Sequence, residues 1–198
     1  MAKTTKKSGG APLTFHDIST DRARRYIVAT PGLHVFFLKN RCGDIEFVLT
    51  RSDTEARIFG IHDAGSTTRC ELTITQRHRA PRTTSQVLIR SILRDHTRFS
   101  FRGLIRIDDG AHDADARLVN NNLLLSPHAM ADTRPQLEII PDDVVCTHAA
   151  TTGPVGDEQL FFLRSRGLTR ARATQLLVEG FTRDVYAMLH SLNIHPHV

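Results

Sequence analysis

The sequence lacks the features that mark a membrane-spanning or secreted chain. Across its 198 residues, no apolar run approaches the roughly 20 residues that a helix needs to cross a bilayer. The first ten residues carry lysines, threonines, one serine and glycines, and no apolar segment follows these charges, so they do not form a secretory signal. We therefore expect a cytoplasmic protein with no membrane partner, and we expect residues 1–14 to be a disordered basic tail.

Cysteine is scarce. The three cysteines are Cys42, Cys70 and Cys146, and they form neither a CxxC pair nor the spacing of a structural zinc site. An odd number of widely spaced cysteines predicts no disulfide framework. Together with the missing signal, it predicts free thiols in a reducing compartment.

Sequence motifs of common enzymes are also absent. There is no Walker A sequence, nucleophile elbow, HExxH or GxGxxG, so we expect neither an autonomous nucleotide-using enzyme nor a hydrolase. The net charge of +5 would permit nucleic-acid binding. However, most arginines alternate with apolar residues along predicted strands, which is typical of a solvated face, and no nucleic-acid-binding motif is present. A nucleic-acid partner is therefore not favoured.

The chain is rich in short runs of alternating apolar and polar residues. Such runs, dominated by Val, Ile, Thr and Phe and bounded by Gly, Asp, Asn, Ser or Pro, predict strands. They are LHVFFLK, DIEFVLT, ARIFGIH, CELTITQ, SQVLIRSIL, FSFRGLIRID, ARLVNNNLLLS and PQLEII, between residues 33 and 140.

The spacing of these runs is regular. Leu72, Leu88 and Leu104 lie 16 residues apart, and Leu123 and Ile139 follow after 19 and 16 residues. A fixed unit of one strand and one turn is typical of a solenoid, in which each unit buries its apolar side against the next. A β-sandwich with evenly spaced strands is the competing interpretation.

The pattern becomes helical after Gly156. The segment DEQLFFLRSRG has Asp157 as a candidate N-cap and Gly167 as a candidate stop. Thr169 is placed to cap a second segment that runs to about Leu192 with apolar residues at helical spacing. Gly180 weakens this second segment and leaves open whether it forms one helix or two.

Four stretches resemble the C-terminal half of the SufB/SufD family of iron–sulfur cluster assembly scaffolds, and SufD more closely than SufB. They are FSFRGLIRI at 99–107, NNNLLLS at 120–126, RPQLEIIPDDVVCTHAATTG at 134–153 and DEQLFFLRSRG at 157–167. The resemblance covers about half of the chain, from about Ser85 to Phe181. It implies a mainly β fold: a right-handed parallel β-helix at residues 15–153, followed by a C-terminal α-helical segment at residues 154–198.

The resemblance also implies a role. SufB and SufD pair through their β-helices, and the C-terminal helical region of each docks SufC, an ABC-type ATPase. The expected function is therefore that of a non-catalytic scaffold subunit with a SufC-like ATPase and a SufB/SufD-type chain as partners. No tightly bound cofactor is expected beyond a transient Fe–S cluster. Known members also have a longer β-helix and an N-terminal helical domain, for which this sequence has no room.

Cys146 and His148 are the candidate cluster or metal ligands. Two residues apart in a strand, they share a face, and thiolate and imidazole both ligate iron. Two ligands are too few for a cluster, so a partner chain would have to complete the shell. The resemblance matches His148 to the SufD histidine at the interface with SufB, and Cys146 to a cysteine of SufD-type sequences. Alternatively, His148 is a hydrogen-bonded interface residue and Cys146 a small buried hydrophobe.

The first helical segment is the candidate ATPase-docking element. Adjacent residues on a helix diverge by about 100°, so one of Phe161 and Phe162 is expected to face the β-helix and the other a groove of the partner. Pure intramolecular packing of both rings is the alternative. The candidate docking residues are Asp157, Glu158, Gln159, Leu160, Phe161, Phe162, Arg164 and Arg166.

Two polar motifs receive structural interpretations. Asn120, Asn121 and Asn122 are expected to form amide ladders between successive coils, and the pair Asp142–Asp143 is expected to be a polar turn. A carbohydrate-active β-helix enzyme would need a wall of carboxylates, for which the sequence offers only this pair and Asp108–Asp109. That enzyme and a basic nucleic-acid-binding module are the alternative functions.

Overall fold

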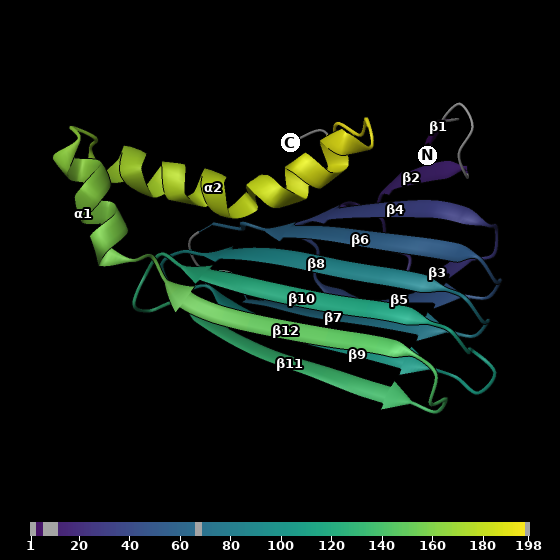
Figure 1. Cartoon of the computed structure of the whole chain (residues 1–198). Coiled ribbons are helices and arrows are strands. Elements are labelled where there is room, and N and C mark those ends of the chain that lie inside the picture. Colours follow the sequence, from purple (N-terminus) through teal and green to yellow (C-terminus); the bar gives the residue numbers. More distant parts are fainter. Residues whose placement is uncertain (1–2, 6–11, 66–68, 197–198) are drawn as a thin grey trace.

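The computed structural model describes residues 3–5, 12–65 and 69–196. The chain forms a series of strands followed by two helices (Figure 1). The strands are β1 (Lys3–Thr5), β2 (Leu13–Asp17), β3 (Arg25–Val28), β4 (Gly32–Lys39), β5 (Gly43–Leu49), β6 (Thr54–His62), β7 (Arg69–His78), β8 (Thr84–Leu93), β9 (Arg98–Ile107), β10 (Asp115–Leu124), β11 (Met130–Ile139) and β12 (Val145–Pro154), and the helices are α1 (Asp157–Ser165) and α2 (Arg170–Ser191).

Successive strands alternate between two sheets. The even-numbered strands and β1 form a seven-stranded sheet, and β3, β5, β7, β9 and β11 form a five-stranded sheet. Apart from the antiparallel pair β1–β2, neighbouring strands are parallel, so the chain winds as a parallel β-helix (Figure 1). The predicted mainly β solenoid with a C-terminal helical segment is confirmed.

Two of the 16-residue units make one coil. Leu72, Leu88 and Leu104 lie on β7, β8 and β9, which belong alternately to the two sheets. Each residue therefore stacks on the residue one full coil away in the same sheet. Arg69 on β7, for example, lies beside Arg98 on β9. Residues about 30 positions apart are thus neighbours in space, although the spacing of the apolar residues shows only the half-coil.

The strand region begins earlier than predicted. β1 (Lys3–Thr5) and the start of β2 at Leu13 both lie inside the range 1–14, which was expected to be a disordered tail. Leu13 is buried and packs in a cluster with Val35 and Phe37 of β4, which explains why this segment is ordered. Residues 6–11 of the expected tail lie outside the described residues.

At strands β4, β6 and β8 the seven-stranded sheet is buried on both faces. Phe36, Ile58 and Val87 point into the coil and pack with residues of the other sheet, such as Phe47. The residues between them point outward into a second cluster, formed by Val35, Phe37, Phe59, Ile61, Leu88 and Ile92 of the sheet with Val185 and Leu189 of α2 and Ile194. This double burial explains why several strands contain continuous apolar runs such as VFFL.

Helix α2 is a single helix that lies along the outer face of this sheet (Figure 1). The side chain of Thr169 accepts a hydrogen bond from the Arg172 amide, so the predicted N-cap is confirmed. Gly180 lies inside the helix without dividing it. An ion pair from Arg90 of β8 to Asp184 adds a polar tie to the apolar contact.

A polar group is buried inside the coil at the end of β7. The two ring nitrogens of His78 lie 2.7 Å from the hydroxyls of Thr83 and Ser85, and Ser85 donates to the Gln76 carbonyl at 2.6 Å. His78 is fully buried, and this burial lowers its pKa to about 4. The imidazole is therefore neutral in the folded protein well below the pH at which an exposed histidine takes up a proton.

The buried His78 predicts a loss of stability in mild acid. In the unfolded chain its imidazole is protonated as the pH falls below about 6.5, whereas the folded chain keeps it neutral until about pH 4, so protons favour unfolding across this window. We expect the free energy of unfolding to fall by roughly 3 kcal/mol on this account. Denaturant titrations at several pH values should show a flatter pH dependence in His78→Gln.

The exposed His112 provides the control for this measurement. Its ion pair with Asp143 raises its pKa, so its small contribution is present at low pH and is lost as the pH rises, the opposite direction. His112→Gln should therefore keep the acid-dependent loss. An equal pH dependence in His78→Gln and in the unmodified chain would contradict a buried neutral imidazole at His78.

Candidate functional site

The candidate cluster ligands lie at an open end of the β-helix. Strands β11 and β12 are the last strands of their sheets, and each pairs with a neighbour on one side only, β9 and β10 respectively. Both lie at one end of the stack (Figure 1). Among the described residues no further coil covers this end, so the side chains that point into the coil here have neighbours on one side and open space on the other.

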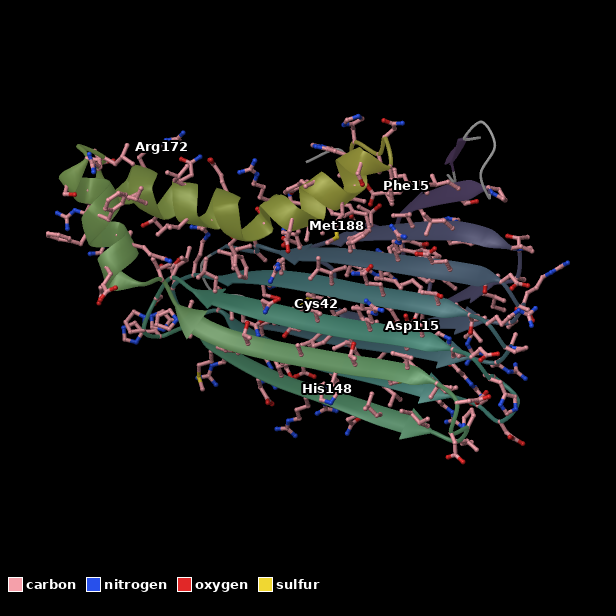
Figure 2. All side chains as sticks on the ribbon, viewed as in Figure 1. Phe15, Cys42, Asp115, His148, Arg172 and Met188 are labelled. Carbon is pink, nitrogen blue, oxygen red and sulfur yellow. A yellow bond between two sulfur atoms is a disulfide. The ribbon has the colours of Figure 1, made fainter. Side chains whose placement is uncertain are left out.

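Cys146 and His148 point to the same side of β12. Their register partners on β10 are Ala116 and Leu118, both buried in the interior of the coil. In-register neighbours in a parallel sheet face the same way, so both candidate ligands project from the inward face of the terminal strand. The shared face follows the predicted strand alternation, and Figure 2 shows His148 at this end of the stack.

The open end exposes groups that an additional coil would bury. Cys146 is half-buried and His148 is exposed. Several apolar side chains of the same end are also open to solvent: Leu137 and Ile139 are 40% exposed, Val145 54% and Ile140 63%. Apolar residues gathered at the edge of a sheet in this way are typical of a surface that pairs with another chain.

The thiol of Cys146 is held in its protonated form. Burial raises its pKa, and the negative charge of Asp115 on the neighbouring strand raises it further. The ligand form of cysteine is the thiolate, so a metal binding here would have to displace this proton. A cationic centre arriving from outside would lower the pKa and make that displacement favourable.

Among the described residues, no third side chain with metal-ligand chemistry joins the two candidate ligands. Within the described residues, no cluster of three His, Cys, Asp or Glu ligand atoms includes Cys146 or His148. The pair therefore fits a shared site, in which a second chain supplies the remaining ligands.

The predicted asparagine ladder is wrong. The register places Ile89 and Ser91 of β8 beside Asn120 and Asn122, so asparagine does not stack on asparagine. Instead, the Asn122 amide donates to Asn120 at 3.0 Å, to the Thr133 hydroxyl of β11 and to the Thr152 hydroxyl of β12. This buried network links β10 to both terminal strands, so it fixes the open end that carries the candidate ligands.

The acidic pair between β11 and β12 forms a bend, as predicted. Asp143 accepts a hydrogen bond from the His112 ring at 2.9 Å. That bond lowers the pKa of Asp143 and raises the pKa of His112, so it widens the pH range over which both groups are charged. The pair is therefore a surface ion pair that holds the turn before β12.

Helix α1 begins at Asp157, but Asp157 is not its cap. The N-cap is Gly156, whose position offers no side-chain hydrogen bond, and Asp157 is the first helical residue. There its charge still interacts favourably with the helix dipole. The predicted stop is confirmed: Gly167 has φ +90°, and the Gly167 and Leu168 amides donate to Arg164 and Leu163.

Both phenylalanines of α1 face solvent. Phe161 is 75% exposed and Phe162 is 56% exposed, whereas Leu160 is the buried residue of this helix. The expectation that one phenylalanine faces the β-helix is therefore wrong, because Leu160 takes the inward position. The Arg166 guanidinium lies 5.2 Å from the centre of the Phe162 ring. The remaining candidate docking residues are also exposed: Asp157, Glu158, Gln159, Arg164 and Arg166.

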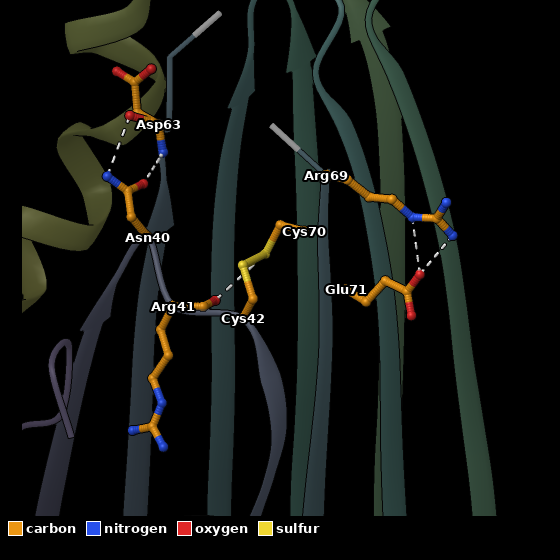
Figure 3. Close-up of a disulfide and its surroundings, with 7 residues drawn as sticks. All are labelled: Asn40, Arg41, Cys42, Asp63, Arg69, Cys70 and Glu71. Atoms are coloured by element: carbon orange, nitrogen blue, oxygen red, sulfur yellow. Dashed lines mark hydrogen bonds and ion pairs between the residues drawn. A yellow bond between two sulfur atoms is a disulfide. The ribbon is translucent and has the colours of Figure 1, made fainter. Parts of the chain in front are cut away.

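The expectation of three free thiols is wrong. Cys42 and Cys70 form a disulfide with a Cα–Cα distance of 5.5 Å, and Cys146 is free (Figure 3). The two cysteines are 28 residues apart, close to the 29-residue register shift that places Gly43 beside Leu72. One coil of the β-helix thus brings them together, so the length of the full coil is the signal that could have predicted this pair.

A third group with ligand chemistry lies beside the disulfide. His62 ends β6 and is only 3% exposed, and within the described part of the chain its ring nitrogens have no hydrogen-bond partner. Burial lowers its pKa, so the ring is neutral near pH 7. No pattern in the sequence singled out this histidine as a partner of the two cysteines.

No helix among the described residues is long and apolar enough to cross a membrane.

Comparison with known proteins gives consistent matches. The family model described as "SUF system FeS cluster assembly, SufBD core domain" matches residues 36–181. The iron–sulfur cluster assembly protein SufD of Escherichia coli is 40% identical over 114 residues, which are 58% of this chain and 27% of that protein. A SufBD family protein of Mycobacterium tuberculosis is 32% identical over 137 residues, 69% of this chain and 16% of that protein. This chain thus spans about a quarter or less of these relatives.

The environment of Cys146 predicts slow alkylation. With the disulfide intact, Cys146 is the free thiol, and its raised pKa should shift its reaction with iodoacetamide to higher pH than that of an exposed cysteine. Asp115→Asn removes the nearby negative charge, so the midpoint of the pH–rate profile should move to lower pH. Intact-mass spectrometry measures the rate.

A second carboxylate gives a matched control. Asp132 of β11 pairs with Arg134 two residues along its strand, just as Asp115 pairs with Arg117. Asp132→Asn should leave the Cys146 profile unchanged. Equal profiles for Asp115→Asn and the unmodified chain would show that Asp115 does not influence the thiol.

Proposed function

The chain belongs to the SufB/SufD family of iron–sulfur cluster assembly proteins, and we propose that it serves there as a non-catalytic, cytoplasmic scaffold subunit. Two features support this role: an open β-helix end that carries Cys146 and His148, and a terminal helix that exposes two adjacent aromatic rings. The first would pair with a SufB/SufD-type chain, and the second would dock a SufC-like ATPase. The observation that carries the proposal is the apolar, one-sided end of the stack.

Pairing through the open end follows from the incomplete hydrogen bonding of β11 and β12. An edge strand has a row of backbone groups that another strand can pair with, and the apolar side chains beside it gain free energy when they are covered. Leu137, Ile139 and Val145 supply that apolar surface here. The partner would be a second SufB/SufD-type chain or another copy of this one.

Pairing would also complete the ligand set. Cys146 and His148 would then lie inside the interface, where side chains from the partner could supply the further ligands that an iron–sulfur cluster needs. The cluster is the product of the assembly and rests there only transiently, so no tightly bound cofactor is proposed. This chain would contribute one thiol, whose proton leaves when iron binds, and one imidazole.

Docking of the ATPase would use α1. Aromatic residues and arginine are the residue types enriched at the energetic centres of interfaces, and Phe161, Phe162 and Arg166 place three of them on one exposed helix. Beside them lies a mainly apolar groove of about 350 Å³, lined by Glu158, Gln159, Phe162, Leu163 and Leu177. Both phenylalanines keep more than half of their surface exposed within the described chain, which favours a partner.

The pairing proposal predicts an oligomer that depends on the apolar end. Light scattering coupled to size exclusion should find the chain paired, with itself or with the SufB-type chain from the same source. Replacing Leu137 and Ile139 by Asp buries two charges in the interface and should abolish the pair. Ile27→Asp is the control, since Ile27 is 64% exposed on β3, far along the five-stranded sheet. Equal pairing of the double variant would refute this interface.

The docking proposal predicts a loss of ATPase affinity. Truncating residues at the centre of an interface typically costs about 2 kcal/mol or more, so Phe161→Ala with Phe162→Ala should weaken binding of the SufC-like ATPase by roughly 30-fold or more. Calorimetric titration measures this affinity. Met188→Ala is the matched control, an exposed apolar residue on α2. Unchanged affinity in the double variant would remove α1 from the docking site.

A further inference from the structure

Three potential metal ligands converge at the β4–β5 turn, the end of β6 and the start of β7. The sulfur atoms of Cys42 and Cys70 and a ring nitrogen of His62 all lie within 4.8 Å of one another. Figure 3 shows the disulfide that joins Cys42 in the β4–β5 turn to Cys70 on β7. Because consecutive coils stack in register, three segments that are distant in sequence present their side chains to one point.

The disulfide links the two cysteines but gives the buried His62 ring no hydrogen-bond partner. This ring is stacked on Phe99 with 4.7 Å between ring centres, is 3% exposed, and has no hydrogen-bond partner at either nitrogen among the residues that the structure describes. Buried polar groups are almost always paired, so an imidazole left without partners indicates a ligand that completes it. The sulfur atoms of Cys42 and Cys70 lie within 4.8 Å of a ring nitrogen, close enough for the three groups to share one ligand.

The donor set specifies the chemistry of that ligand. Two thiolates and a neutral imidazole form a soft set that suits Zn²⁺ and other thiophilic cations rather than Mg²⁺ or Ca²⁺. Zinc bonds of about 2.0–2.3 Å require ligand atoms a few ångström apart, which the present spread of 4.8 Å allows with small side-chain movements. Cys42 is exposed, so the site is open to an entering ion on that side.

We propose that Cys42, His62 and Cys70 bind one thiophilic divalent cation, such as Zn²⁺, when the Cys42–Cys70 disulfide is reduced. A dithiol or phosphine reductant supplies the two electrons that break the S–S bond, and each sulfur takes up a proton. The incoming cation displaces both protons and forms bonds to the two thiolates and to the lone pair of the imidazole. Three protein ligands leave a fourth position for water.

This site is separate from the proposed cluster ligands. Cys146 and His148 lie on the terminal strand β12, whereas Cys42 lies in the β4–β5 turn and Cys70 on β7, two strands away from the terminal strand β11. The inference therefore does not rest on the proposed scaffold function, and its test requires neither an ATPase nor a pairing partner.

Cobalt binding tests the site directly. The full-length chain carrying Cys146→Ser, so that only Cys42 and Cys70 remain, is reduced anaerobically with a phosphine and titrated with Co²⁺. We expect one equivalent to bind with thiolate-to-cobalt charge-transfer absorption and tetrahedral d–d bands, and Zn²⁺ to displace it. The oxidised chain should show neither absorption. A reduced chain that binds no Co²⁺ with charge transfer overturns the proposal.

Substitutions identify the ligands. Cys42→Ser, at an exposed position, should retain the fold and lose much of the charge-transfer intensity. His62→Leu should weaken binding by at least the roughly tenfold that even an outer-shell partner contributes. His34→Gln is the control, because His34 is a buried histidine of β4 whose ring bonds to Thr30. Unchanged affinity and spectrum in His62→Leu would exclude His62 as a ligand and overturn the three-residue site.

A stability measurement covers the case in which His62→Leu fails to fold. A cation that binds only the folded chain raises the unfolding temperature. Zn²⁺ should therefore raise the unfolding temperature of the reduced Cys146→Ser chain and leave that of the oxidised chain unchanged. Equal responses of the two redox forms would contradict binding by Cys42 and Cys70.

Discussion

The in-register stacking of parallel coils is the constraint on which the rest of the structure depends. Each strand obtains its backbone hydrogen bonds from strands one coil away, and each inward side chain obtains its packing from the same register. The stack therefore protects its inner coils and leaves strands at its ends with a neighbour on one side only: β11 and β12 at the last coil, and β3 at the first. The features that the proposed function uses, an apolar surface and two ligands on an inward face, follow from that missing neighbour.

Helix α2 covers apolar side chains that the stacking of coils leaves on the outer face of the seven-stranded sheet. A coil buries the inner face of each sheet and leaves the outer face exposed to solvent. Strands β4, β6 and β8 nevertheless carry large apolar residues on both faces. Helix α2 covers the outer face through Val185 and Leu189, and Arg90 with Asp184 adds a charged tie. Because α2 takes this position, α1 is left beyond the sheet with its phenylalanines in solvent (Figure 1).

Local signals in the sequence predicted most of the fold, because they act over a few residues. Alternation identified the strands, Thr169 and Gly167 identified a helix start and a helix stop, and the adjacent acidic residues identified a bend. What could not be predicted depends on which residues one coil brings together. The Cys42–Cys70 disulfide, the position of His62 beside it and the neighbours of the asparagines are all set by a register of about 30 residues, and the apolar spacing reveals only half of that length.

The short connection between β12 and α1 joins the two halves of the proposed function. Strand β12 ends at Pro154 and α1 begins at Asp157, so only Val155 and Gly156 separate the strand that carries Cys146 and His148 from the helix that exposes the phenylalanines. The Val155 amide donates a hydrogen bond to the Leu124 carbonyl of β10, which restrains this short connection. A partner that moves α1 would therefore pull directly on the terminal strand. The Asn122 side chain also donates to the Thr152 hydroxyl near the end of β12, so a displacement of that strand would have to break this hydrogen bond.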